Sequence, residues 1–180
     1  MMTPNASLAP APPAWFRRMQ SVEKQIVVAE KAVCALALLV MAFATVASVV
    51  VRNLGLALPN YSEIGLAALA PLTLIGGALC TYLGSHISVE IIHAAGGRRL
   101  RQVASVLTAI GVLSFCAIYF RSGWIIMQEF RMTGDKLLDL GTPLWPLAAL
   151  LPLGMVLMAL HTIMQIIAMV IYRTEGGSTA

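Results

Sequence analysis

The residues of this chain that could do chemistry gather in one polar stretch, GSHISVEIIHAAGGRRLR, from Gly84 to Arg101. If a helix continues through this stretch, His86, Glu90 and His93 lie at positions i, i+4 and i+7 and share one face. Such a face could ligate a metal, bind haem or relay protons. The spacing is not H-E-x-x-H and no fourth ligand is near, which disfavours a metal site. We therefore interpret the stretch as an interfacial extension of a membrane helix, ended by AAGG and followed by arginines at the anionic leaflet.

The amino-acid composition indicates the class of protein in which these residues lie. Of 180 residues, 59% are hydrophobic and 11% are charged, whereas a soluble domain has roughly 25% charged residues. The expected class is therefore an integral membrane protein. The net charge of +4 comes from basic residues between apolar runs, where they indicate topology rather than nucleic-acid binding. The three cysteines are spread over separate apolar runs without a C-x-x-C pair, which favours helix packing over a disulfide or a metal site.

Four uncharged stretches are long enough to cross a bilayer as helices, which takes about 20 residues each. The predicted fold class is an all-α integral membrane protein with four transmembrane helices, both termini in the cytoplasm, and short interfacial helices. We expect a disordered Pro/Ala-rich tail at 1–15, an interfacial amphipathic segment at 16–31, a membrane domain at 32–172 and a cytoplasmic tail at 173–180. The predicted spans are 32–51, 64–83, 102–120 and 148–171.

The orientation follows from the distribution of lysine and arginine. Eight basic residues lie in the amino-terminal segment, the second loop and the tail, against four in the first and third loops. The positive-inside rule places the side with eight in the cytoplasm. The eight are Arg17, Arg18, Lys24, Lys31, Arg98, Arg99, Arg101 and Arg173.

Inside the predicted spans, two features could matter. A lone histidine at the depth of His161 is more often hydrogen-bonded to a neighbouring helix than catalytic, and we expect that role. Every Asp, Glu, Lys and Arg lies at or beyond a span boundary, so we expect no buried charge and no ion or proton pathway within this chain alone. The second span has a stripe of small residues at Gly76, Gly77, Cys80 and Gly84, which allows close backbone approach, either to the other three helices or to a larger partner.

Two motif-bearing segments resemble a known family. The segment VVVRNLGLALPNYSEIGLAALAPLTLIGGALCTYLGSHISVEII is similar to the small permease subunit of TRAP (tripartite ATP-independent periplasmic) transporters, the DctQ-like family. The segment GTPLWPLAALLPLGMVLMALHTIMQII is similar to the last helix of the same subunit. Asn60, Tyr61 and Ser62 stand where the family commonly has a Trp and often two consecutive acids, and Glu90 stands where Asp is usual. The matching positions are Arg52, Glu63, Gly76, His86, Ile87, Glu90, Pro143, Trp145, Pro152 and Gly154.

The resemblance implies a role and a set of partners. In TRAP systems a periplasmic binding protein delivers an organic acid, and a large permease subunit carries the Na⁺ and substrate sites. The small subunit serves as a scaffold. We therefore expect no enzymatic activity, no catalytic or metal site and no cofactor in this chain, which would lie in the bacterial inner membrane. Its expected partners are the large permease, the binding protein and membrane lipids.

Three alternatives stay open at this point. One is the small subunit of a tripartite tricarboxylate transporter, which has the same role and differs only in motif detail. Another is a membrane anchor that binds haem or quinone through His86, His93 or His161. The third is a stand-alone small exporter, which would need an acidic residue embedded in the membrane. The solute itself is not encoded in this chain, because specificity in such systems lies mainly in the binding protein and the large subunit.

Overall fold

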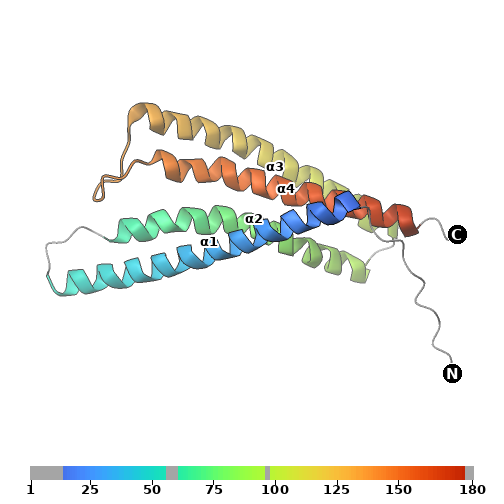
Figure 1. Cartoon of the computed structure of the whole chain (residues 1–180), viewed down its shortest axis with the longest axis horizontal. Coiled ribbons are helices and arrows are strands. Elements are labelled where there is room, and N and C mark those ends of the chain that lie inside the picture. The colour runs from blue at the N-terminus through green and yellow to red at the C-terminus, as the bar shows by residue number, and fades with distance from the viewer. Residues whose placement is uncertain (1–13, 56–60, 96–97, 177–180) are drawn as a thin grey trace, which may run out of the picture.

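The chain folds into four long helices. The computed structural model describes residues 14–55, 61–95 and 98–176, and for 84–95, 98–102, 170 and 172–176 it describes the backbone alone. Each helix contains one predicted span and is long and apolar enough to cross a membrane, which confirms the all-α membrane fold. The helices are α1 (Ala14–Asn53), α2 (Ser62–Ala95), α3 (Arg98–Thr133) and α4 (Trp145–Gly176) (Figure 1).

Helix α1 is longer than a bilayer requires. Its 40 residues span about 60 Å at 1.5 Å per residue, twice the hydrocarbon thickness of about 30 Å. The predicted interfacial segment 16–31 is the first part of this helix and not a separate short helix. The location of this part at a membrane surface stays a prediction, as do the span boundaries. The predicted tail 1–15 lies almost wholly outside the described residues.

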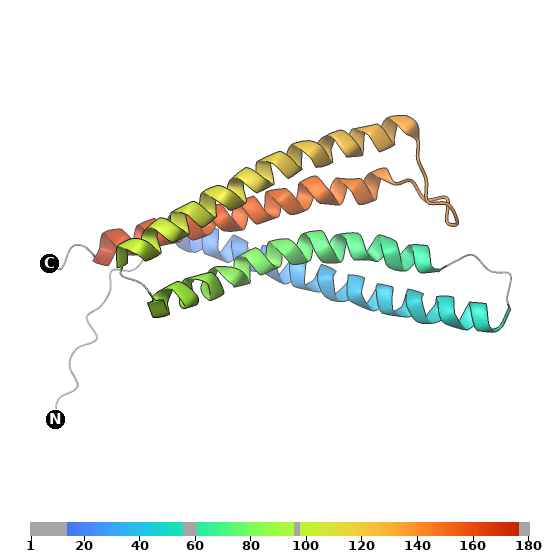
Figure 2. The same cartoon turned by 180° about the vertical axis from the view of Figure 1, so that it is seen from behind.

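The helices form an open row rather than a closed bundle. Helix α1 packs on α2, α2 packs on α4, and α4 packs on α3, while α2 and α3 touch only slightly. Figures 1 and 2 show the α1–α2 pair and the α3–α4 pair spreading apart toward the end that carries the first and third loops. Helices α2 and α4 run parallel, and each is antiparallel to its outer neighbour. The start of α1 and the end of α4 therefore lie at the same end of the molecule.

Glycines set the closest helix contacts. A methyl group on Gly154 of α4 would lie 3.0 Å from the carbonyl oxygen of Leu74 on α2. A methyl group on Gly123 of α3 would lie 2.9 Å from Cγ of Leu151 on α4. Because side-chain carbons rarely approach other atoms so closely, a side chain at either position would require its neighbours to shift, and at Gly154 those neighbours include the backbone of α2.

The small-residue stripe on α2 is not where that helix packs most tightly. A methyl group on Gly76 would meet only the Cys34 sulfur, at 3.8 Å, and Cys80 is exposed. The buried face of α2 instead carries Ala68, Ile75 and Ala78. Within this chain Gly76 therefore makes an ordinary contact with α1, and the alternative of close approach to a larger partner stays a prediction.

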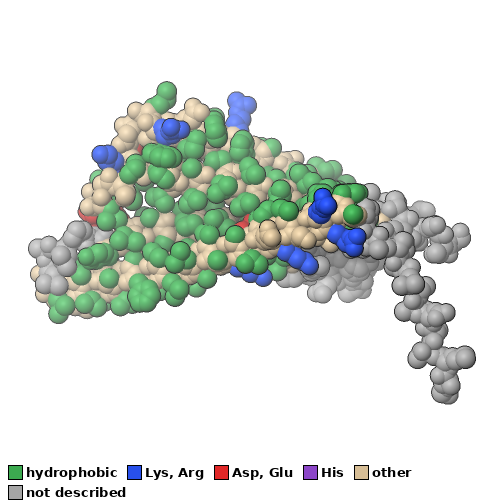
Figure 3. Space-filling view, in the orientation of Figure 1, with side chains coloured by type: hydrophobic (Ala, Val, Ile, Leu, Met, Phe, Trp, Pro, Cys, Tyr) green, Lys and Arg blue, Asp and Glu red, His purple; other side chains and the backbone are tan. Residues whose placement is uncertain are grey.

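The open row leaves apolar side chains on the outside. Figure 3 shows hydrophobic side chains over most of the visible face, with Lys and Arg toward its ends and edges. In the most apolar window of α4, 33% of residues are buried, compared with 6% in α3. Helix α4 is thus the central packing element, and the other helices offer most of their surface to lipid or to a partner.

Candidate functional site

A cluster of two glutamates and one histidine connects α1 to α4. The His161 side chain is fully buried. Its Nε2 atom lies 3.1 and 3.2 Å from the two carboxylate oxygens of Glu30. Its Nδ1 atom lies 3.4 Å from Oε1 of Glu23. The expected hydrogen bond from His161 to a neighbouring helix is confirmed, and it is made to carboxylates on both sides of the ring.

The two glutamates are buried to different degrees. The Glu30 side chain is 3% exposed and that of Glu23 is 13% exposed. The expectation that no charged side chain is buried is therefore wrong for Glu30. The physical reason is that His161 offers a polar partner, so the carboxylate is not left in an apolar interior without a hydrogen bond.

Helix α1 brings both carboxylates to α4 through a seven-residue repeat. Phe16, Glu30, Ala37 and Ala44 are buried at intervals of seven or fourteen residues, and Glu23 falls in the same register. A repeat of 3.5 residues per turn keeps one seam of a helix against its neighbours over a long distance. The surrounding Arg17, Arg18, Lys24 and Lys31 are exposed on other faces.

This repeat is the signal that could have revealed the cluster from the sequence. The charges of segment 16–31 by themselves predict an interfacial amphipathic segment. In a seven-residue repeat, Glu23 and Glu30 fall on the same helix face as Ala37 and Ala44. This shared face predicts that both glutamates point toward the neighbouring helices.

Helix α2 completes the surroundings of His161. The ring of Tyr82 lies 5.3 Å from the imidazole, centroid to centroid. One turn along α4, the Gln165 amide donates a hydrogen bond of 2.9 Å to the carbonyl oxygen of Thr81. Polar side chains of α4 therefore contact α1 and α2 at nearly the same level.

A second polar contact ties the start of α2 to the loop between α3 and α4. Oε2 of Glu63 accepts hydrogen bonds of 3.0 Å from the backbone N–H groups of Asp139 and Leu140. The loop is shaped by Gly134 and Gly141, which have φ angles of +70° and +65° and can adopt them because they lack a Cβ atom. Glu63, one of the family-motif candidates, thus holds the third loop against α2.

Two other family-motif candidates, Pro143 and Trp145, lie at or just before the start of α4. Pro143 pairs with Lys136 in an isolated bridge, and Trp145 begins α4 with Arg131 stacked over its ring at 5.3 Å. This arrangement joins the end of α3 to the start of α4. Pro152 is buried inside α4. It lies two residues before Gly154, which provides the contact with Leu74.

The remaining candidates are not brought together with this group. Arg52 is exposed at the end of α1. Gly77 is half-buried, and a methyl group there would lie 3.6 Å from Met158, an ordinary contact. The structure describes the backbone alone at Gly84, His86, Glu90 and His93, so their interfacial role stays a prediction.

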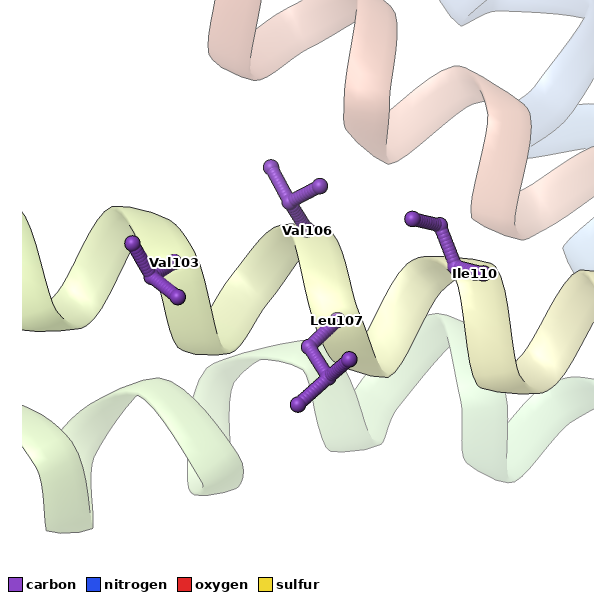
Figure 4. A pocket seen from close by; sticks show the side chains of 4 residues that line it. All are labelled: Val103, Val106, Leu107 and Ile110. Carbon is purple, nitrogen blue, oxygen red and sulfur yellow. The ribbon is translucent and has the colours of Figure 1, made fainter.

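One shallow groove on α3 is apolar. It is lined by Val103, Val106, Leu107 and Ile110, and Figure 4 shows Leu107 pointing toward α2 and Val106 pointing away from it. None of these side chains has a polar group that could orient a solute, so the groove suits contact with apolar chains.

Four long apolar helices in an open row, tied by a few polar contacts, define a multi-pass membrane protein. The family model for the DctQ component of tripartite ATP-independent periplasmic transporters matches residues 27–171. The chain belongs to this family, as the motifs around Glu63 and Gly154 predict. Comparison with curated proteins and with solved structures gave no match.

Proposed function

We propose that this chain is the small membrane subunit that packs against the large permease of a TRAP transporter. In that role it supports Na⁺-coupled uptake of an organic acid that a periplasmic binding protein delivers to the membrane complex. Membership of the DctQ family supports the subunit assignment. The observation that carries the proposal is the open row, because a row of four helices offers a broad apolar side to a larger protein.

The exposed face of α2 is the candidate contact with the permease. Leu66, Leu69, Thr73, Cys80 and Leu83 are all exposed. They follow one another at helical spacing, with the half-buried Gly76 in the middle of the same face. Small residues bordered by leucines let a partner helix approach closely in a membrane. Contact with the permease would give the small-residue stripe a role, because packing among the four helices of this chain does not use it.

The haem-binding alternative fits His161 poorly. An axial ligand needs a free ring nitrogen, and both ring nitrogens of His161 lie against carboxylates. A small exporter would have to carry its solute on this chain alone. The buried carboxylate that such an exporter needs is present as Glu30, but it is held by His161.

The test is co-purification of the chain with a large multi-span permease in mild detergent, comparing two variants. Gly76→Leu adds a bulky side chain in the middle of the α2 face. Gly111→Leu adds the same side chain on α3, where nothing lies within 4 Å of a methyl group. We expect the first variant to lose the permease and the second to keep it.

Each outcome has a defined meaning. If both variants keep the permease, the α2 face is not the contact. If the unaltered chain purifies alone and its deletion leaves organic-acid uptake intact, the subunit assignment itself is wrong. Both variants must reach the membrane at wild-type levels, which an antibody against a terminal tag can measure. Gly76→Leu must also keep the thermal stability of the wild type, because its side chain lies beside Cys34 of α1.

A further inference from the structure

The cluster at His161 has a proton requirement that follows from its geometry. Both ring nitrogens lie within reach of carboxylate oxygens, at 3.4 Å from Glu23 and 3.1 Å from Glu30. An ionised carboxylate can only accept hydrogen bonds, and a neutral imidazole has a single N–H to donate. A neutral histidine between two ionised glutamates would therefore leave one nitrogen lone pair facing an oxygen lone pair.

One additional proton removes this conflict. Placed on the ring, it makes an imidazolium that donates to both carboxylates. Placed on one carboxyl, it lets that group donate to the ring, while the ring donates to the other. In either form the cluster holds one proton more than a neutral imidazole with two carboxylates. Without it, a repulsive contact remains beside a fully buried ring, where such contacts cost most.

Among the side chains that the structure describes, the groups that face the cluster supply no other positive charge to replace that proton. Helix α2 contributes the ring of Tyr82, and the neighbouring position of α4, Thr162, donates its hydroxyl to the backbone of its own helix. Between 103 and 120, α3 has Cys116 and Tyr119 as its titratable residues. The nearest lysines of α1, Lys24 and Lys31, are exposed, and the half-buried Cys34, one turn beyond Glu30, carries no positive charge in either protonation state. Among the described residues, both ion pairs are made by His161.

The cluster also connects the first half of α1 to α4. Backbone packing joins α1 mainly to α2, and the polar contact with His161 connects the first half of α1 to α4, alongside the buried apolar side chains of Phe16 and Val27. Its outer member, Glu23, is partly exposed and gives the proton a route to water. By the predicted topology this end of the molecule faces the cytoplasm.

We propose that Glu23, Glu30 and His161 form a proton-binding latch that holds the amino-terminal half of α1 against α4. The latch is closed with one proton bound and opens when that proton leaves. The proposal does not depend on the transport role of the chain.

The sign and size of the pH dependence follow from the proton count. The closed state binds one proton more than an open state in which the imidazole is solvated and neutral, so a rise in pH favours the open state. The equilibrium constant for closing then falls by up to about tenfold per pH unit, because one proton is exchanged.

Glu30→Gln keeps the hydrogen bond between position 30 and the His161 ring but removes the need for the additional proton. A glutamine at this position donates its amide N–H to the ring nitrogen, while the other ring nitrogen donates its N–H to Glu23. Every group is then satisfied by a neutral histidine, and closure no longer needs an extra proton. Glu129→Gln makes the same chemical change on an exposed residue of α3 and serves as the matched control.

The experiment uses the full chain in lipid nanodiscs, from about pH 6 to about pH 9, the range in which histidine charge usually changes. Hydrogen exchange of the backbone at 14–31, corrected for its intrinsic pH dependence, reports closure. Nitrogen-15 NMR of the His161 ring, assigned by substituting His86 and His93, and the infrared band of protonated carboxyl groups report the proton.

We expect protection of 14–31 to fall together with loss of the proton in the wild type and in Glu129→Gln. Protection in Glu30→Gln should stay constant over the same range. The proposal is overturned if the wild type holds no extra proton at the acidic end of the range or stays protected after losing it. It is also overturned if Glu30→Gln shows the wild-type pH dependence or no protection at any pH.

Discussion

The contact between Gly154 and the backbone of Leu74 predicts that a single methyl group at this glycine weakens the packing of α4 on α2. In Gly154→Ala, the new carbon would lie 3.0 Å from the Leu74 carbonyl oxygen and 3.1 Å from its Cβ atom. These neighbours belong to or adjoin the α2 backbone, so a rotamer change cannot relieve the clash and the helices must move apart. Overpacking of this kind costs about 1–3 kcal/mol.

The comparison that isolates this cost is with Gly111→Ala. Both substitutions replace a helical glycine by alanine and share the resulting conformational gain of about 0.5–1 kcal/mol. Only Gly154 has a close neighbour, since nothing lies within 4 Å of a methyl group on Gly111. The difference in stability between the two variants should therefore equal the packing cost.

Thermal unfolding in a mild detergent measures this difference. A chain of this size shifts its midpoint by about 2–4 °C per kcal/mol, so Gly154→Ala should melt several degrees below Gly111→Ala. Gly77→Ala is a second control within the same helix pair, because its methyl group would lie 3.6 Å from Met158, an ordinary contact. The reasoning is refuted if Gly154→Ala melts at or above the temperature of Gly111→Ala.

Three further substitutions test the polar contacts and the loop. Glu63→Ala should destabilise the chain by about 1 kcal/mol in detergent unfolding, because two backbone N–H groups lose their acceptor in a partly exposed site; Glu63→Gln, which keeps an acceptor oxygen, should cost less. Gly141→Ala should cost about 1–2 kcal/mol in the same assay, since alanine is strained at its φ of +65°, and wild-type stability would argue against that loop geometry. Gln165→Met removes the hydrogen bond to Thr81 and should raise hydrogen exchange in the second half of α4 at a cost of about 1 kcal/mol; unchanged exchange would show that this bond contributes nothing.

The four helices could be predicted from the sequence because hydropathy decides them locally. Each span has about the length that a bilayer needs, and each is bounded by charge or by a Gly- or Pro-rich turn. The family motifs likewise depend on local residues. Glu63 and Trp145 lie where α2 and α4 begin.

The tertiary contacts could not be predicted in the same way. The small-residue stripe at Gly76 predicted close helix approach, but the closest approaches within the chain are at Gly123 and Gly154, because hydropathy does not define which face of a uniformly apolar helix packs inside. The carboxylates of Glu23 and Glu30 looked water-facing beside Lys24 and Lys31. Their burial depends on His161, more than 130 residues away in the chain, and only the seven-residue repeat in α1 indicates it.

We propose that the large permease needs this chain as a subunit for transport. The most direct measurement is uptake of a radiolabelled organic acid into proteoliposomes that contain the permease with or without this chain, in the presence of the binding protein and an inward Na⁺ gradient. We predict uptake only when both membrane subunits and the binding protein are present, and none from this chain alone. Equal uptake by the permease without this chain would contradict the claim.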